Sequence, residues 1–109
     1  MDDWLVEQVL VAVELIPAGQ VATYGDVAGL VGIGPRQAGT ILRHHGAAVP
    51  WWRVTNHVGD LPAPLLARAR DHWTAEGIVV KANGRGCAIT SCRVDPVSWA
   101  AEWERALPS

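Results

Sequence analysis

Residues 23–46, TYGDVAGLVGIGPRQAGTILRHHG, carry the local signals for two short helices joined by a glycine-rich turn. Thr23 is a favoured N-cap residue, and Asp26, three positions later, completes a pattern that resembles a capping box. This start predicts a helix over residues 24–31 with its apolar residues on one side. The Gly-Ile-Gly sequence at 32–34 ends that helix, because glycine disfavours a helix interior.

A second helix is predicted over residues 35–45. Pro35 suits its first position, where the missing N–H has no helical partner to lose, and Gly46 is expected to end it in the left-handed conformation. Two short helices and a glycine-bearing turn favour a helix-turn-helix, although a plain helical hairpin with a solvated polar face fits as well. The side chains that would contact nucleic acid are Arg36, Gln37, Thr40 and Arg43, and the small Gly39 would allow close approach to a groove.

The flanking segments predict a mainly α-helical single domain with short strands, a winged helix-turn-helix that spans residues 1–109. Apolar periodicity predicts amphipathic helices before and after the central pair, and Asn83-Gly84 predicts a hairpin turn. The expected helices cover residues 3–16, 63–76 and 96–107, and the expected strands cover 51–55 and 78–80, with 87–89 pairing back.

Charge is distributed unevenly along the chain, whose formal net charge is −2. No acidic residue lies between Asp26 and Asp60, whereas this window holds three arginines and two adjacent histidines. This pattern predicts one electropositive face on an acidic protein.

Composition excludes several classes of protein. The sequence has no run of 18 apolar residues, so no membrane span is predicted. Its acidic start does not resemble a signal peptide. Cys87 and Cys92 are too few for a disulfide scaffold, so we expect free thiols in the cytoplasm, on the nucleoid if the source is prokaryotic. The histidines and cysteines lack metal-ligand spacing, and neither a metal nor a cofactor is expected.

The second informative stretch is Val49-Pro50-Trp51-Trp52-Arg53-Val54. In a strand, the two indoles would point to opposite faces, one into the core and the other towards a surface or pocket. An indole can stack on a base that has been rotated out of a duplex, and an arginine at the start of the second helix could fill the space left behind.

Several motifs, in order, resemble the DNA-binding domain of the O6-alkylguanine-DNA alkyltransferases over about residues 3–80. They are PAGQVATYGDVA at 17–28, PRQAG at 35–39, VPWWRV at 49–54 and AEG at 75–77. The active-site motif of that family is Pro-Cys-His-Arg, where this chain has Pro50-Trp51-Trp52-Arg53. Tryptophan in place of the cysteine is typical of the alkyltransferase-like proteins.

The resemblance implies a role for individual residues. Tyr24 would press on the DNA backbone and help to rotate the nucleotide, and Arg36 would enter the base stack. The helix over 35–43 would lie in the minor groove. The lesion pocket would comprise Tyr24, Pro50, Trp51, Trp52, Arg53 and Glu76.

Three departures from the family change what the resemblance implies. Trp51 offers no thiolate, so alkyl transfer at that position is chemically unavailable. Trp52 replaces the histidine that acts as base, which would leave Glu76 without its partner and with a structural role only. His45 stands near where the family has an asparagine, which alters the expected hinge.

The resemblance therefore implies a non-enzymatic monomer that binds O6-alkylguanine in duplex DNA by nucleotide flipping and marks it for nucleotide excision repair proteins. Two alternatives stay open. One is a methyl acceptor that uses Cys87 or Cys92, and the other is a winged-helix DNA-binding or interaction module without lesion specificity. Residues 81–109, which the resemblance does not cover, either close the core or offer a docking face.

Overall fold

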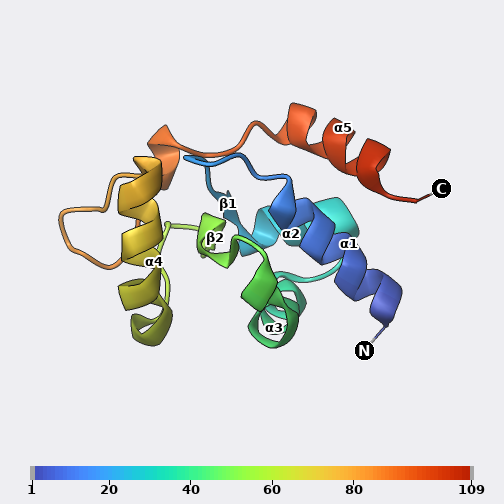
Figure 1. Cartoon of the computed structure of the whole chain (residues 1–109), viewed down its shortest axis with the longest axis horizontal. Helices are drawn as coiled ribbons and strands as arrows, with labels where there is room; N and C mark the ends of the chain where they lie inside the picture. Colours follow the sequence, from blue (N-terminus) through green and yellow to red (C-terminus); the bar gives the residue numbers. More distant parts are fainter. Residues whose placement is uncertain (1, 109) are drawn as a thin grey trace.

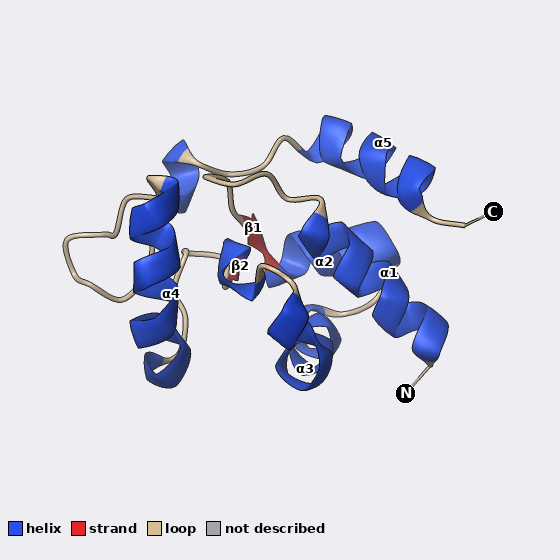
Figure 2. Ribbon diagram, in the orientation of Figure 1, coloured by secondary structure: helices blue, strands red, loops and turns tan. Residues whose placement is uncertain are grey.

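The computed structural model describes residues 2–108 and shows a mainly helical single domain (Figures 1 and 2). Its elements are, in chain order, α1 (Asp3–Glu14), β1 (Ala22–Thr23), α2 (Tyr24–Val31), α3 (Pro35–His45), two 3-10 turns (Gly46–Ala48 and Trp51–Arg53), β2 (Val54–Thr55), α4 (Ala63–Glu76), a third 3-10 turn (Ile89–Ser91) and α5 (Pro96–Ala106). No helix within residues 2–108 is long and apolar enough to cross a bilayer.

The predicted helix boundaries are set by local capping. Asp2 caps α1 by accepting a hydrogen bond from the backbone N–H of Trp4 at 3.0 Å. Thr23 and Asp26 form the predicted capping box at the start of α2, with bonds of 2.9 and 3.0 Å between each side chain and the other's backbone N–H. Gly77 ends α4 with φ +75°, a conformation that costs glycine no steric clash.

Two groups of buried apolar side chains form the core. The larger lies among α1, α2, α3 and α5, and the smaller surrounds Trp73 of α4. The short parallel pair of β1 and β2, in the register Ala22↔Val54 and Thr23↔Thr55, lies between them (Figure 2). Tyr24 packs against both groups, which places the first residue of α2 at their junction.

Residues 81–108 close the core from outside the helix-turn-helix. Val21 pairs with Arg93, and Arg93 also forms an ion pair with Asp26 at 2.6 Å. On α5, the indole N–H groups of Trp99 and Trp103 donate to the carbonyls of Ala12 and Gln8 at 2.8 and 3.0 Å. The last helix is therefore fixed along α1, on the side of the molecule away from α3 (Figure 1).

The prediction of a strand over residues 51–55 is wrong for residues 51–53. Trp51–Arg53 form a 3-10 turn, closed by the N–H of Arg53 on the carbonyl of Pro50 at 3.0 Å, and only Val54–Thr55 are extended. Contacts with α4 explain the difference, because the Trp52 carbonyl accepts a hydrogen bond from the Trp73 indole at 2.7 Å. The two indoles are therefore not placed by strand alternation.

Two further predictions need correction. Gly46 has φ −89° rather than the expected left-handed conformation, because the chain continues directly into the turn of residues 46–48. A side chain there would nevertheless be crowded, since a Cβ would lie 3.2 Å from Leu42 Cδ2. The expected strand at 78–80 is reduced to one antiparallel bridge, between Val80 and Cys87, around the turn at Gly84.

Candidate nucleic-acid interface

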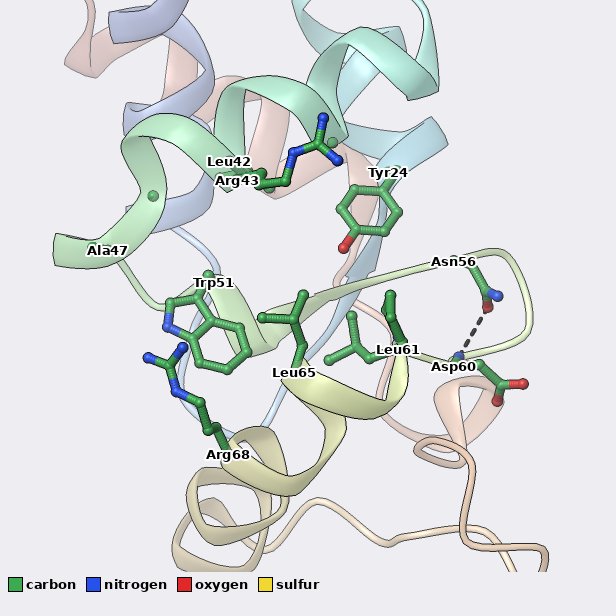
Figure 3. A pocket seen from close by; sticks show the side chains of 13 residues that line it. Tyr24, Leu42, Arg43, Ala47, Trp51, Asn56, Asp60, Leu61, Leu65 and Arg68 are labelled. Atoms are coloured by element: carbon green, nitrogen blue, oxygen red, sulfur yellow. Dashed lines mark hydrogen bonds between the residues drawn. The ribbon is translucent and has the colours of Figure 1, made fainter.

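A cavity of about 660 Å³ opens between α3 and α4, a volume typical of small-molecule sites (Figure 3). Its lining is mostly apolar and comes from segments distant in sequence, with a few polar groups at its edges. The residues are Tyr24, Gly39, Leu42, Arg43, Gly46, Ala47, Trp51, Asn56, Asp60, Leu61, Pro62, Leu65 and Arg68.

Tyr24 approaches this cavity from the start of α2, with its hydroxyl directed into the space (Figure 3). Burial raises the pKa of its phenol above the ordinary value, so the hydroxyl stays protonated and able to donate. Gly39 of α3 faces the ring, because a Cβ at that position would lie 3.9 Å from the Tyr24 ring carbons. Tyr24 and Gly39, both predicted to lie against DNA, are thus adjacent in space.

Trp51 forms another wall of the cavity, and Arg68 of α4 lies over it. The guanidinium carbon of Arg68 is 5.1 Å from the centre of a Trp51 ring, a cation–π distance (Figure 3). Arg68 is not among the site residues predicted from the sequence. A signal was available, because Arg68, His72 and Glu76 recur at four-residue intervals and therefore share one face of α4.

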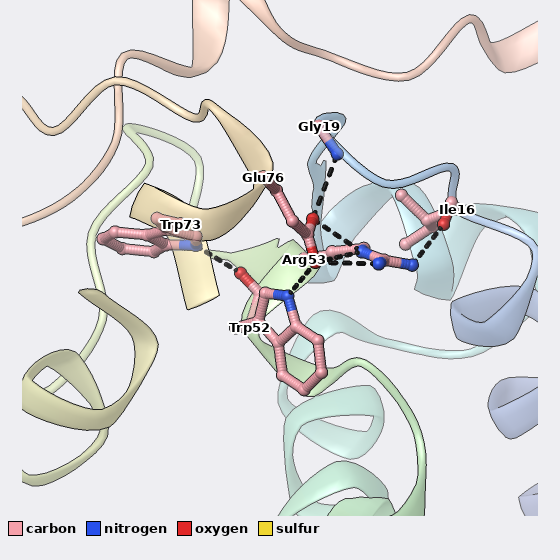
Figure 4. Close-up of polar contacts among 6 residues, drawn as sticks. All are labelled: Ile16, Gly19, Trp52, Arg53, Trp73 and Glu76. Atoms are coloured by element: carbon pink, nitrogen blue, oxygen red, sulfur yellow. Dashed lines mark hydrogen bonds and ion pairs between the residues drawn. The ribbon is translucent and has the colours of Figure 1, made fainter. Parts of the chain in front are cut away.

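Trp52 does not line this cavity, and its indole joins a network around Glu76 (Figure 4). The Glu76 carboxylate accepts hydrogen bonds from the Trp52 indole at 2.7 Å, from Arg53 at 2.8 to 3.2 Å, and from the backbone of Gly19 at 3.0 Å. Arg53 also donates to the carbonyl of Ile16 at 2.9 Å. The network ties the turn of residues 51–53 to α4 and to the segment that follows α1.

Burial alone would raise the pKa of Glu76, but the hydrogen bonds from Arg53, Gly19 and Trp52 outweigh it and hold that pKa below its ordinary value. The expected loss of a partner for Glu76 is therefore wrong, because the Trp52 indole N–H binds the carboxylate directly. Glu76 remains ionised and anchors the loop that carries Trp51.

The six predicted lesion-pocket residues separate into three groups. Tyr24 and Trp51 line the cavity between α3 and α4. Pro50, Trp52 and Arg53 instead line a more open hollow of about 570 Å³ next to Glu14. Glu76 lines neither hollow and instead binds Trp52 and Arg53.

Exposed positive charge outside the ion pairs of the described residues lies on α3 and α4. Three of the nine basic side chains form ion pairs in residues 2–108, and these are Arg53, Lys81 and Arg93. Arg36 and Arg43 on α3 and Arg68 on α4 are exposed and outside those pairs. Pro35 and Gln37 are likewise exposed, whereas the Thr40 hydroxyl donates back to the Arg36 carbonyl at 3.0 Å.

The two thiols lie away from the cavity lining. Burial, with the neighbouring Cys92, raises the pKa of Cys87 to about 12, and burial also raises the pKa of Cys92. Both side chains therefore stay as thiols at neutral pH, the unreactive form. Within residues 2–108 no three potential ligands gather as a metal site would require.

Residues 5–78 match the family described as 6-O-methylguanine DNA methyltransferase, DNA binding domain. The chain belongs to this family. Among relatives, a DNA base-flipping protein of Escherichia coli (strain K12) is 40% identical over 90 residues, which cover 77% of this chain and 70% of that protein. The alkyltransferase-like protein 1 of Schizosaccharomyces pombe is 34% identical over 79 residues, covering 65% of this chain and 73% of that protein.

The fold of this family member is also found in a solved complex. A crystal structure of the Schizosaccharomyces pombe protein with damaged DNA containing O6-carboxymethylguanine matches with a TM-score of 0.76 and 28% identity. The match covers 88% of this chain and 99% of that one. Together with the relatives, this likeness makes the chain an alkyltransferase-like protein with the expected winged-helix fold.

Proposed function

We propose that the protein is a non-enzymatic sensor of DNA damage, which binds O6-alkylguanine by rotating the nucleotide out of the duplex. One observation carries the proposal: Tyr24 and Trp51 converge on a cavity that the exposed Arg43 of α3 also lines. The relatives support it, because a protein 40% identical to this chain is named a DNA base-flipping protein. A solved structure with a similar fold also contains damaged DNA.

The cavity offers what a rotated base needs. Stacking of a base on an aromatic side chain contributes about 1–3 kcal/mol, which offsets part of the few kcal/mol that unstacking costs. Trp51 supplies the aromatic face, and Tyr24 supplies a neutral hydroxyl that can donate to a phosphate or base. Arg36 and Arg43 are exposed and seven positions apart, so they share one face of α3 and would bind the phosphate backbone.

Recognition of the alkyl group follows from the apolar part of the lining. Leu42, Leu61 and Leu65 face the cavity and would remove an alkyl group from water. Burial of one CH₂-sized group contributes about 0.8 kcal/mol, or about a fourfold gain in affinity. A damaged base also costs less to rotate than a paired guanine, which adds to the preference.

Alkyl transfer is not part of the proposed function. A transfer enzyme needs an activated nucleophile at the bound lesion, and neither Cys87 nor Cys92 lines the cavity. Their raised pKa values further remove the thiolate that would attack the alkyl carbon. The protein would therefore hold the lesion unchanged.

The deciding experiment is a titration of two fluorescein-labelled duplexes that differ only by one O6-methylguanine. We expect the methylated duplex to bind at least about fourfold more tightly. Equal affinities would overturn lesion recognition and favour a winged-helix module without it. Intact-mass measurement after incubation should show no methyl gain, and a gain on either cysteine would instead establish transfer.

A matched pair of variants tests the orientation of the DNA. Arg36→Ala should weaken binding of both duplexes, whereas Arg105→Ala removes an exposed arginine from α5, away from α3, and should leave affinity unchanged. Equal effects of the two variants would show that charge, and not the α3 surface, governs binding.

We also propose that the protein acts as a monomer and presents the bound lesion to nucleotide excision repair proteins. The large exposed apolar side chains support a monomer, because Trp4, Val58, Val79 and Val97 lie on separate segments of the described chain. Light scattering of the free and DNA-bound protein would show any dimer. Epistasis between its deletion and loss of excision repair, scored by survival of alkylated cells, tests the downstream step.

A further inference from the structure

His72 of α4 joins the two adjacent tryptophans into one aromatic cluster. Its imidazole stacks on Trp52, with ring centres 3.6 Å apart and an angle of 6° between the planes. Trp51 stands across this stack, at 80° to His72 and 85° to Trp52, with ring centres 6.1 and 5.8 Å away. The imidazole and the Trp52 indole are closely stacked and nearly parallel, and Trp51 meets both rings in the edge-to-face arrangement that aromatic rings prefer.

The two indoles are held in different ways. Trp52 is fixed by hydrogen bonds at two points, from its indole N–H to Glu76 and from the Trp73 indole to its carbonyl, each 2.7 Å long. The indole of Trp51 makes no side-chain hydrogen bond within residues 2–108. Its plane is set by packing alone, against His72 and Trp52 at its edge and below the guanidinium of Arg68.

His72 is half-buried and does not line the cavity between α3 and α4, so it would act there only through Trp51. Without its flat ring, the face of Trp52 would lose its cover and the edge of Trp51 would lose one of its two aromatic neighbours. The Trp51 side chain would then have room to turn about its χ angles, because no polar group holds it.

We propose that His72 is a positioning residue, which sets the plane of Trp51 and thereby the preference of the cavity for alkylated guanine. The inference rests on the proposed function for its effect on binding, but the orientation of Trp51 can be measured in the free protein. The requirement is for a flat ring at position 72 and not for the chemistry of histidine.

The test compares His72→Phe, which keeps a flat ring, with His72→Leu, which keeps apolar bulk without one. Asp71→Asn, an exposed neighbour on the same helix, is the control. Near-ultraviolet circular dichroism of the free proteins reports the indole environment, and each variant is then titrated with the plain and methylated duplexes. A thermal melt confirms that each variant is folded at the assay temperature.

We expect His72→Leu to change the near-ultraviolet spectrum and to lower the ratio of methylated to plain affinity about 2- to 10-fold, the range of one aromatic pair. Phenylalanine should restore both. In a Trp51→Phe background, His72→Leu should have little further effect on the ratio. A leucine variant with the parent's spectrum and ratio, or a phenylalanine variant as impaired as leucine, would overturn the proposal.

The two proposals fail in distinguishable ways. A parent protein without any preference for the methylated duplex refutes lesion recognition, and the spectra of the free variants then still decide whether His72 positions Trp51. A parent with the preference and a leucine variant unchanged in both measurements refutes the role of His72 alone.

Discussion

Replacing Glu76 by glutamine is the sharpest test of how the cavity wall is held. The substitution changes one oxygen to an NH₂ group and removes one charge, with almost no change of shape. In the parent, one carboxylate oxygen accepts from both the Trp52 indole at 2.7 Å and the Arg53 guanidinium at 2.8 Å. With an amide nitrogen there, both donors would face another donor.

The expected loss of stability follows from the number of donors that lose their acceptor. A buried donor left unsatisfied costs about 1–3 kcal/mol, and more when the partner is charged. Two donors are affected, and the side chains of Arg53 and Glu76 are only 16% and 12% exposed, so water replaces little of the loss. We expect Glu76→Gln to lower the free energy of unfolding by about 2–4 kcal/mol and the melting temperature by roughly 10–20 °C.

The assay is urea unfolding followed by circular dichroism, with Glu102→Gln as the control. That control makes the same chemical change at an exposed position of α5, where we expect less than about 0.5 kcal/mol. A Glu76→Gln protein as stable as this control would refute the reasoning, because it would show that the network holds no net free energy.

A pH series adds a second check. The pKa of Glu76 is lowered in the folded protein, so its contribution is fully present above the ordinary carboxyl pKa of about 4.3 and is lost as the pH falls through the folded value. The stability gap between parent and Glu76→Gln should therefore be constant from about pH 7 to 5 and shrink below that. A gap that widens on acidification would contradict this sign.

Three other predictions test separate features. Gly59→Ala should destabilise the protein by more than about 2 kcal/mol, because φ is +88° and a Cβ would lie too close to the Cys87 carbonyl oxygen. Gly29→Ala, in open space on α2, should instead stabilise it by about 0.5–1 kcal/mol, and thermal melts of both variants measure the difference. Trp73→Phe removes a buried indole and its bond to the Trp52 carbonyl, which should cost about 2–4 kcal/mol in urea unfolding. Arg43→Ala should weaken binding to both duplexes equally. It should also reduce the slope of log affinity against log salt concentration by about 1, as measured by fluorescence anisotropy.

The helices could be predicted from the sequence because their signals are local. Thr23 with Asp26, Pro35, and Gly77 each act on backbone groups within a few residues, so no knowledge of the tertiary fold is needed. The turn at 51–53 could not be predicted in this way. Its conformation depends on Glu76 and Trp73, which lie more than 20 residues further along the chain.

The functional site could be predicted only in part, because contacts between distant segments also shape it. A motif-level resemblance identifies the segment that carries Trp51 but says little about where Trp52 points, because that depends on a carboxylate and an imidazole on α4. Asn56 and Leu65 line the cavity from the β2–α4 loop and from α4, and nothing in their local sequence marks them as cavity residues. Only the common face of Arg68, His72 and Glu76 offered a signal.

The junction of the two apolar clusters at Tyr24 has a mechanical consequence. Leu42 of the larger cluster and Leu61 of the smaller one lie on the same cavity, so its width is the distance between two separately packed bodies. A small rotation of one body against the other would resize the cavity without opening either core, as in hinge and shear motions. Adducts of different bulk should then shift the relative placement of α3 and α4, which distance measurements between spin labels on those two helices would record.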